Sequence, residues 1–357
     1  MSPIHRTDRC PPDQAYYAPS EPGGPQTALL FPMKRILIVK LTSLGDMVFT
    51  QPLVADLQRA FPGVKIDWIA DSYCADVPRW NPNIDRVIAA PLRSFKKARS
   101  WAGLREIFAA LRALRREKYD AVLDVHGVYK SAIVSFLART RHRYGLPVQE
   151  LGESGARFAY NHVFQPFVEE DCARNRMRRA VSRALGYEMT REMEYGLEMP
   201  ADTPAAAAKG PYAMLFHATS SEEKKWPVAD WISVGSAISA RGLRVLVPWG
   251  NDAERLEAET IAASVPGAEV MPRMSITGVA QMVGKASLVV GMDTGFVHIA
   301  DALRRPTVIL FTNTSRHLYG VDAPGRAVSL GGGGVVPQRA EVLAAIDEVM
   351  PRVTSTN

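Results

Sequence analysis

Short apolar runs rich in β-branched residues alternate with amphipathic segments along most of the chain, and this alternation limits the possible folds more than any other feature. Residues 36–39 (ILIV) form the first such run, and Val48, Leu53, Val54 and Leu57 recur at helical spacing after it. A run this apolar is typical of a strand that is covered on both faces. The alternation therefore predicts an α/β fold, in which helices cover both sides of a parallel sheet.

A polar, alanine-rich stretch divides the alternation into two series. The sequence EMPADTPAAAAKGP at residues 198–211 is typical of an interdomain linker. The economical interpretation is two Rossmann-like lobes whose parallel sheets face each other across a cleft. A flexible loop is predicted for the glycine run at 331–334, ahead of a helix at 338–349. The predicted parts are a disordered tail at 1–32, a first lobe at 33–197, the linker at 198–211, a second lobe at 212–335, and a C-terminal helix and tail at 336–357.

The composition is that of an ordinary globular protein. Its 357 residues, 47% of them hydrophobic, suffice for two domains of roughly 150 residues each. No apolar run approaches the ~18 residues of a membrane span, and residues 1–30 lack the apolar region of a signal peptide. Cys10, Cys74 and Cys172 show neither metal-ligand spacing nor an even count. We therefore expect a cytoplasmic protein, whose net charge of +6 bears on an anionic partner.

The first candidate for chemistry follows the first predicted strand. The turn Ser-Leu-Gly-Asp ends at Asp46, and the loop after the carboxyl end of a parallel strand lies at the ligand crevice. Asp is also a favoured N-cap, so Asp46 could simply cap the helix that follows. From the spacing alone, the two interpretations are equally supported.

In the second series, three predicted strands each end in polar residues. Three such ends in one sheet should meet at one crevice. Hydroxyls and an ammonium group before a helix that Pro227 could open fit a phosphate site, although lysines in a polar loop can also be merely solvated. The residues are Thr219, Ser220, Lys224 and Lys225 in HATSSEEKKWP, Trp249, Gly250 and Glu254 in VPWGNDAE, and Asp293, Thr294, Gly295 and His298 in LVVGMDTGFVHIA.

The Asp-Thr-Gly turn of this second series favours a diphosphate beside a sugar. Thr294 and Gly295 suit an anion, because glycine permits close approach of the backbone and a helix start presents free N–H groups. Asp293 would repel that anion, so we expect it to point at neutral hydroxyls. His298 could donate to a phosphate or could be a packing residue. An aspartic protease would need a partner aspartate in a β-rich fold, which the α/β pattern argues against.

An ordered set of segments resembles the bacterial ADP-heptose:lipopolysaccharide heptosyltransferases of glycosyltransferase family 9, and most closely the type I enzymes. The resemblance spans essentially residues 33–351 and implies the GT-B fold, metal-independent chemistry and inversion at the anomeric centre. It implies transfer of heptose from ADP-heptose to a Kdo sugar of Kdo2-lipid A, with no cofactor beyond the donor. The segments are ILIVKLTSLGDMVFTQP, KIDWIAD, YDAVLDVHGVYKSA, HATSSEEKKWP, LVPWG, PRMSITGVAQMV and GMDTGFVHIADAL.

The same resemblance assigns roles to residues. It makes Asp46 the general base and puts the acceptor on the first lobe, which fits the absence of a glycine-rich nucleotide fingerprint there. The donor diphosphate is placed at Thr219, Ser220, Lys224, Thr294, Gly295 and His298, the heptose and ribose at Asp293 and Glu254, and the adenine at Met274. Without the resemblance, Met274 could equally be a core methionine.

Acceptor phosphates are assigned to a basic segment of the first lobe. Arg93, Lys96 and Lys97 match the family, but Ser94 stands where a second arginine is common. An arginine usual near Gly152 is missing, with Arg157 a possible substitute. The resemblance implies a peripheral enzyme at the cytoplasmic face of the inner membrane.

Three alternatives remain. A later-acting heptosyltransferase or another nucleotide-sugar transferase would share the fold. A nicotinamide-dependent dehydrogenase is disfavoured because no Gly-x-Gly-x-x-Gly opens either lobe. A nucleic-acid binder is suggested by RNRMRRAVSR at 174–183, but this segment lacks interleaved aromatics and is predicted to be the solvated basic face of a helix.

Overall fold

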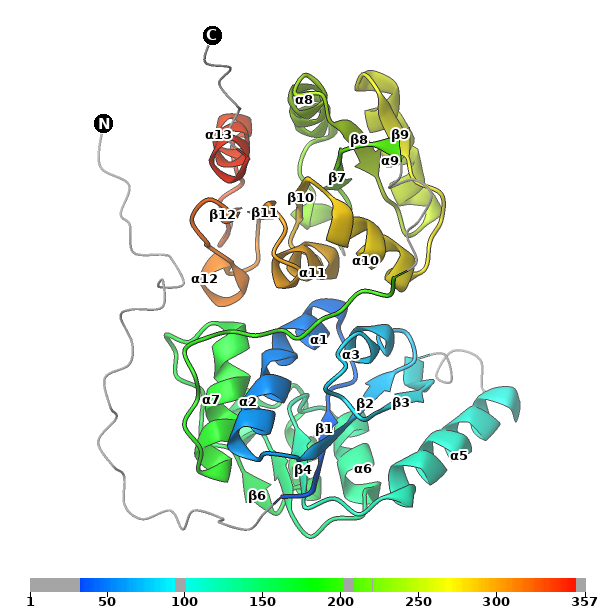
Figure 1. Ribbon diagram of the computed structural model, residues 1–357, viewed down its shortest axis with the longest axis vertical. Coiled ribbons are helices and arrows are strands. Elements are labelled where there is room, and N and C mark those ends of the chain that lie inside the picture. Colours follow the sequence, from blue (N-terminus) through cyan, green and yellow to red (C-terminus); the bar gives the residue numbers. More distant parts are fainter. Residues whose placement is uncertain (1–32, 94–100, 202–208, 220, 351–357) are drawn as a thin grey trace. The chain divides into compact units, whose positions relative to one another are not determined.

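The computed structural model describes residues 33–93, 101–201, 209–219 and 221–350 (Figure 1). These residues form two compact units that divide between Glu198 and Met199. We name them lobe 1 and lobe 2 in chain order. Among the described residues, no helix is both long and apolar enough to cross a lipid bilayer.

Lobe 1 contains a parallel sheet of six strands in the order β3-β2-β1-β4-β5-β6. Its strands are β1 (Arg35–Val39), β2 (Lys65–Asp71), β3 (Arg86–Ala90), β4 (Ala121–Asp124), β5 (Arg143–Gly145) and β6 (His162–Val163). Its helices are α1 (Leu44–Thr50), α2 (Pro52–Ala60), α3 (Asp76–Arg79), α5 (Trp101–Arg116), α6 (Tyr129–Leu137) and α7 (Ala173–Leu185), with the 3-10 turns η1 (Val148–Glu150) and η2 (Ser154–Ala159).

Lobe 2 repeats this arrangement with the order β12-β11-β10-β7-β8-β9. Its strands are β7 (Tyr212–Phe216), β8 (Arg244–Val247), β9 (Ala268–Val270), β10 (Leu288–Met292), β11 (Thr307–Phe311) and β12 (Ala327–Gly331). Its helices are α8 (Val228–Ser239), α9 (Asp252–Ser264), α10 (Ile276–Lys285), α11 (Gly295–Ala302), α12 (Arg316–Tyr319) and α13 (Arg339–Val349), with the 3-10 turn η4 (Glu222–Lys224).

The central strands are buried on both faces, as their uninterrupted apolar sequences predict. In β1 the side chains of residues 36–39 are fully buried, and in β10 all five residues are buried. Helices of each lobe cover both sides of its sheet in Figure 1. The α/β class with two Rossmann-like lobes is therefore confirmed.

In both sheets the strand order reverses between the first strand and the fourth. This switch point lies between β1 and β4 in lobe 1 and between β7 and β10 in lobe 2. Open parallel sheets bind ligands outside the carboxyl ends of the strands at such a point. The fold alone thus directs attention to the residues after β1, β4, β7 and β10.

The glycine run forms a hydrogen-bonded turn, not the flexible loop that its composition predicted. Gly331 ends β12, and the Gly332 N–H donates to the Val335 carbonyl at 3.0 Å. The Gly334 N–H donates to the Thr312 carbonyl at 2.8 Å. All four glycines have positive φ, a backbone conformation that other residues rarely adopt, so glycine is needed for this turn. The helix predicted at 338–349 is confirmed as α13, with Gln338 as its N-cap.

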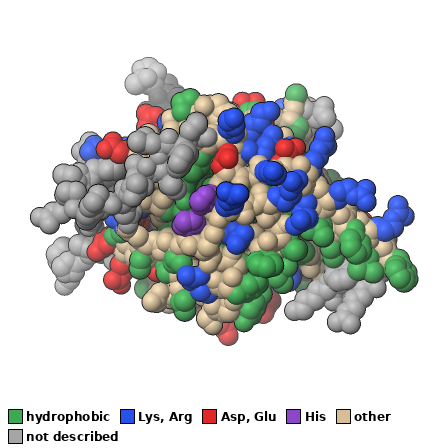
Figure 2. Space-filling model, turned by 90° about the horizontal axis from the view of Figure 1, so that it is seen from below, with side chains coloured by type: hydrophobic (Ala, Val, Ile, Leu, Met, Phe, Trp, Pro, Cys, Tyr) green, Lys and Arg blue, Asp and Glu red, His purple; other side chains and the backbone are tan. Residues whose placement is uncertain are grey.

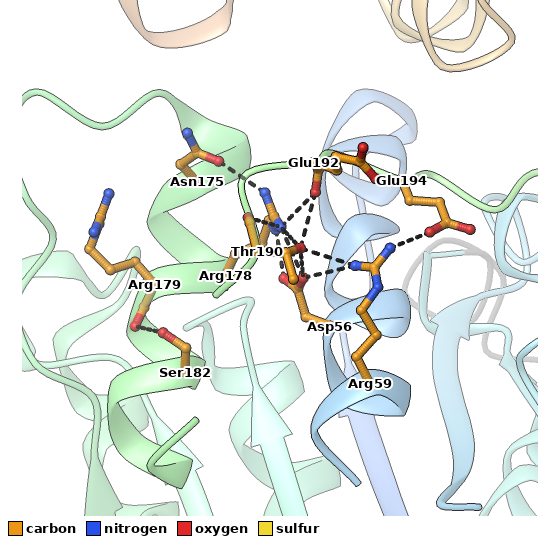
Figure 3. Close-up of polar contacts among 9 residues, drawn as sticks. All are labelled: Asp56, Arg59, Asn175, Arg178, Arg179, Ser182, Thr190, Glu192 and Glu194. Atoms are coloured by element: carbon orange, nitrogen blue, oxygen red, sulfur yellow. Dashed lines mark hydrogen bonds and ion pairs between the residues drawn. The ribbon is translucent and has the colours of Figure 1, made fainter. Parts of the chain in front are cut away.

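Helix α7 is not the solvated basic face predicted for residues 174–183. Arg174 and Arg178 are 4% and 1% exposed. Arg178 forms a bidentate ion pair with buried Asp56 of α2, with N–O distances of 2.6 and 2.9 Å (Figure 3). It also donates to the backbone carbonyls of Thr190 and Glu192, in the segment that leaves α7. These arginines hold lobe 1 together internally, which removes the main argument for a nucleic-acid surface.

Candidate active site

Asp46 lies at the switch point of lobe 1, as the third residue of α1. Its Oδ2 accepts hydrogen bonds from the Ser43 N–H at 3.1 Å and from the Ser43 hydroxyl at 3.2 Å. The N-cap is Ser43, not Asp46 as the capping interpretation had predicted, but the Asp46 carboxylate helps to fix the start of the helix as the N3 residue of a capping box. Its side chain remains 40% exposed, so it can also reach a substrate. Fixing the start of the helix and reaching a substrate are therefore compatible.

Lys40 is a neighbour of Asp46 that the sequence analysis missed. It directly follows β1, is 8% exposed, and places Nζ 3.8 Å from Asp46 Oδ2. The ammonium group also donates to the Val125 carbonyl, after β4, at 3.3 Å. Lys40 thus connects the two strand ends of the switch point and restrains the carboxylate. A lysine directly after a fully apolar strand was the available signal, because a buried lysine requires an anionic or carbonyl partner.

A cavity of about 230 Å³ opens beside the turn that carries Asp46. Arg93 and Lys130 bring positive charge to its wall, which suits an anionic ligand. Arg93 lies over the Tyr73 ring, with its guanidinium carbon 5.3 Å from the ring centroid. Lys96 and Lys97, assigned with Arg93 to the acceptor, lie outside the described residues. The other lining residues are Leu41, Thr42, Ser43, Leu44, Asp71, Cys74, Leu92, His126 and Val128.

Two titratable groups in the cavity wall are held in their neutral forms. Burial, with the positive charge of Lys40, lowers the pKa of His126 to about 4, so the ring is neutral near pH 7. Burial, with the negative charge of Asp71, raises the pKa of Cys74 to about 12, so its thiol stays protonated. Neither group is suited to act as a charged nucleophile or acid at neutral pH.

Asp124, the other carboxylate at this switch point, has a structural role. It is fully buried, and Oδ1 accepts from the N–H groups of His126 and Gly127 at 3.0 and 3.2 Å. Oδ2 accepts from the hydroxyls of Ser135 and Tyr160 at 3.0 and 2.9 Å. With both oxygens engaged and no access to solvent, Asp124 shapes the loop after β4 and leaves Asp46 as the accessible carboxylate. Arg157, the possible substitute near Gly152, donates Nη1 to the Tyr160 carbonyl and does not line the cavity.

In lobe 2 the loop after β7 carries two adjacent lysines, Lys224 and Lys225, whose surroundings differ. Lys225 is bound by Glu222 and Glu257, which raise its pKa, so its charge is neutralised locally. Lys224 forms no ion pair with the described residues, and its carbonyl accepts from the Thr312 hydroxyl at 3.2 Å. Thr219, directly before the turn, is half-buried. Lys224 is therefore the cation of this loop that can neutralise a ligand, whereas Ser220 lies outside the described residues.

The Asp-Thr-Gly turn after β10 combines three ligand-binding features. Asp293 is 20% exposed, and His298 Nε2 lies 2.8 Å from its Oδ1. Thr294 is the N-cap of α11, and its hydroxyl oxygen is buried without a hydrogen-bond partner among the described residues. Gly295 begins the helix, whose first N–H groups favour an anion. His298 is 3% exposed, and its contact with Asp293 makes it an orienting residue for that carboxylate.

Glu254 lies in the first turn of α9, and Met274 lies two residues before the start of α10. Glu254 Oε2 accepts from the Gly250 N–H at 2.7 Å, which ties it to the turn after β8. Its backbone carbonyl lies 3.1 Å from Nε2 of His217, the residue after β7, so these two strand ends are joined. Met274 precedes α10 and is half-buried against Gly278. Since β10, β7 and β8 are consecutive in the sheet, the structure brings Asp293, Thr219 and Glu254 to one edge of lobe 2.

The described residues contain no group of three or more His, Cys, Asp or Glu side chains that could hold a metal ion. Cationic and neutral hydrogen-bond donors are present instead. Among them, the Lys224 ammonium group, the Thr294 hydroxyl and the first N–H groups of α11 are chemically suited to bind a diphosphate.

Sequence comparisons agree on one family. Residues 107–328 match the family described as glycosyltransferase family 9 (heptosyltransferase). Lipopolysaccharide heptosyltransferase 1 of Escherichia coli K12 is 34% identical over 290 residues, which cover 80% of this chain and 90% of that protein. The protein of the same name from Pseudomonas aeruginosa is 36% identical over 290 residues, covering 79% of each chain.

Solved structures give the same answer. The E. coli heptosyltransferase WaaC with ADP superimposes with a TM-score of 0.79 at 32% identity, covering 88% of this chain and 99% of that one. WaaC with ADP-2-deoxy-2-fluoro heptose gives a TM-score of 0.74 at 31% identity over the same shares. E. coli heptosyltransferase II gives 0.68 at 18% identity, which supports the fold alone.

Proposed function

This chain belongs to glycosyltransferase family 9, the heptosyltransferases, and from that premise we propose the acceptor, the base and the stereochemistry of its reaction. The enzyme transfers heptose from ADP-heptose in the assembly of the lipopolysaccharide inner core. We propose that the acceptor is a Kdo sugar of Kdo2-lipid A and that transfer inverts the anomeric centre. The protein then works as a peripheral enzyme at the cytoplasmic face of the inner membrane.

The observation that carries the proposal is the Asp-Thr-Gly turn at the switch point of lobe 2. There a buried hydroxyl without a described partner, the first N–H groups of α11 and a partly exposed carboxylate lie within three consecutive residues. The first two suit a diphosphate, and the third suits sugar hydroxyls. An ADP-sugar presents both kinds of group in one molecule. Lys224, without an ion pair among the described residues, supplies the remaining positive charge.

The proposed reaction needs a base for the acceptor and fixed donors for the leaving group. Asp46 removes the proton of the Kdo hydroxyl as its oxygen attacks the anomeric carbon of heptose. The bond between that carbon and the diphosphate oxygen breaks, and ADP leaves with both bonding electrons. Positioned general-base catalysis contributes roughly 10²–10⁴-fold, and preorganised donors at the leaving oxygens contribute a comparable factor.

Lobe 1 is proposed to hold the acceptor through the cavity beside Asp46. Arg93 and Lys130 line it together with Asp71, and His126 is neutral near pH 7, so the ring adds no charge to the cavity. Phosphates of lipid A are the anions expected there. Lys96 and Lys97 are also proposed to bind acceptor phosphates.

The test is a transfer assay followed by mass spectrometry. Purified enzyme with ADP-heptose and Kdo2-lipid A should yield a product heavier by one heptose, and the configuration at its new bond should be opposite to that of the donor. An acceptor that already carries the first heptose should react far more slowly. Preference for that heptosylated acceptor would assign the protein to a later step, a role supported less well because relatives named heptosyltransferase 2 or 3 are only 22–24% identical.

A further inference from the structure

Lobe 1 exposes many more large hydrophobic side chains than lobe 2. Among the described residues, twelve are exposed, and nine of these belong to lobe 1. Scattered single hydrophobic residues on a surface are ordinary, but several on one face mark an interaction site. Their positions on the helices therefore matter more than their number.

Helices α5 and α6 cover the same face of the lobe 1 sheet. Leu114 of α5 and Val134 of α6 belong to one buried cluster with the strands beneath them. At the ends of the two helices, Arg115 Nη1 donates to the Leu137 carbonyl at 2.9 Å. Because both helices pack inward on one core, their outer sides point away from the sheet in the same direction.

The outer side of α6 is apolar where a surface helix is normally polar. Tyr129, Ile133 and Phe136 follow one another at positions i, i+4 and i+7, and each is at least 50% exposed. Phe158 of η2 extends this row, with its ring centroid 6.0 Å from that of Phe136. Three large apolar side chains of α6, spread over about two turns, thus face away from the core.

The outer side of α5 alternates aromatic and basic residues. Trp101, Arg105, Phe108 and Arg112 recur at helical spacing, and Trp101 and Phe108 are 85% and 63% exposed. The helix carries four arginines and one glutamate. In Figure 2, hydrophobic and basic side chains share the right-hand edge of the view, the side on which Figure 1 places α5.

We propose that this outer face of α5 and α6, formed by Trp101, Arg105, Phe108, Arg112, Ile133 and Phe136, docks lobe 1 on an anionic lipid bilayer. Aromatic residues alternating with arginines match the headgroup region, where rings enter the acyl boundary and guanidinium groups stay with lipid phosphates. Because α5 has four arginines and one glutamate, its charge is positive and complementary to the negative charge of an anionic bilayer. The inference rests on the proposed function, since it supplies the surface through which the enzyme would reach a lipid acceptor.

The experiment measures partition of the full chain into sedimenting vesicles of phosphatidylcholine with and without phosphatidylglycerol. An apolar variant, Phe108→Ser with Phe136→Ser, should lower binding to both kinds of vesicle by roughly tenfold or more. A charge variant, Arg105→Gln with Arg112→Gln, should lose on the order of tenfold only with phosphatidylglycerol and should flatten the salt dependence. The matched control, Leu256→Ser with Val335→Ser, removes side chains of similar exposure from lobe 2 and should bind like the wild type.

Transfer to a soluble Kdo acceptor without acyl chains separates this inference from the proposed function. All three variants should retain wild-type turnover with that acceptor, which also shows that they are folded. Wild-type binding by both the apolar and the charge variants, or an equal loss by the control, would overturn the docking face. The docking face would also be overturned if the wild type self-associated in analytical sedimentation and the apolar variant did not. The face would then join two copies of the chain. A wild-type enzyme that fails on every Kdo acceptor would instead refute the proposed function and leave vesicle binding to be judged separately.

Trp101 offers a direct readout of insertion. Trp68, Trp80, Trp226 and Trp231 are buried and Trp249 of lobe 2 is half-buried, so bromine-labelled lipids should quench the exposed Trp101 most strongly. The quenching should largely disappear in Trp101→Phe. Quenching that persists in this variant would place the contact with lipid elsewhere.

Discussion

The two lobes share one strand order but use equivalent strand ends differently. An aspartate follows or ends the fourth strand of each sheet, in Asp124-Val-His-Gly and in Asp293-Thr-Gly. Asp124 is fully buried with both oxygens engaged, whereas Asp293 is 20% exposed and contacts one histidine. The loops after the first strands differ in charge. Lobe 1 presents the carboxylate of Asp46 there, and lobe 2 presents the ammonium group of Lys224. One scaffold can therefore place a carboxylate or an ammonium group at the same topological position, and the packing around Asp124 and Asp293 decides which of these two carboxylates is accessible.

A second difference lies in how the lobes are stabilised. Lobe 1 contains the buried Arg178–Asp56 pair, in which both side chains are 1% exposed. In lobe 2 the Arg244–Glu269 pair joins side chains that are 20% and 45% exposed. Charges removed from water are costly unless paired, so the first pair should matter far more when it is broken.

The largest effect is expected from the carboxylate that distinguishes lobe 1. Asp46→Asn keeps a side chain of the same shape but cannot accept the proton of the acceptor hydroxyl. Turnover should fall at least about a hundredfold, and up to roughly 10⁴-fold, with little change in ADP-heptose affinity. Steady-state kinetics and donor titration measure the two quantities. Asp124→Asn is the matched variant, and it should lower thermal stability while its folded fraction keeps most of its turnover; near-normal turnover in Asp46→Asn would contradict the assignment.

Breaking the buried pair of lobe 1 should have the next largest effect. Asp56→Asn leaves the Arg178 guanidinium buried without its counter-charge, so the free energy of unfolding should fall by about 3–5 kcal/mol. Arg244→Gln in lobe 2 should cost less than about 1 kcal/mol, because that pair is exposed to solvent. Urea denaturation of the two variants measures this contrast. Equal losses would mean that burial does not set the energetic difference between these pairs.

The architecture was predictable from the sequence, whereas the burial of individual charged side chains was not. The two sheets follow from local patterns, since runs such as ILIV and LVVGM are apolar enough to be recognised as buried strands. The strand-end rule then located Asp46 and Asp293. It could not separate Asp46 from Asp124, because the burial of Asp124 depends on Tyr160, 36 residues away. The burial of Arg178 likewise depends on Asp56, 122 residues away, so a local pattern of arginines resembled a solvated surface.

Two adjacent lysines sharpen the comparison in lobe 2. Lys224→Ala should raise the dissociation constant for ADP-heptose by roughly ten- to a hundredfold, the usual range for a charge-assisted hydrogen bond to phosphate. Lys225→Ala should change donor affinity only slightly, because Glu222 and Glu257 already hold its ammonium group. Isothermal titration gives both values. A chelator should leave turnover unchanged, and activity restored only by a divalent ion would assign the charge balance to a metal.

The smallest expected effect concerns the pH dependence of stability, and it originates in the wall of the lobe 1 cavity. Burial, assisted by Lys40, lowers the pKa of His126 to about 4 from its ordinary value of 6.5. Above pH 6.5 the ring is neutral in both the folded and the unfolded chain, so it adds no pH dependence. Between 6.5 and about 4 the unfolded chain binds a proton that the fold excludes, so stability must fall as the pH falls.

His126→Gln removes this titration and tests its size. At pH 5 the wild type should lose on the order of 1 kcal/mol relative to pH 7 through this ring, after allowance for its partial contact with solvent. The variant should lack that loss, so its stability relative to the wild type should improve as the solution is acidified. His217 at the equivalent edge of lobe 2 also has a pKa lowered by burial, so His217→Gln serves as the comparison. This variant should likewise lose less stability than the wild type as the pH falls from 7 to 4. Denaturant titrations at several pH values between 7 and 4 decide the matter. Parallel curves for wild type and His126→Gln would show that the ring titrates in the fold as it does in the unfolded chain, so that its burial in the cavity wall would not lower its pKa.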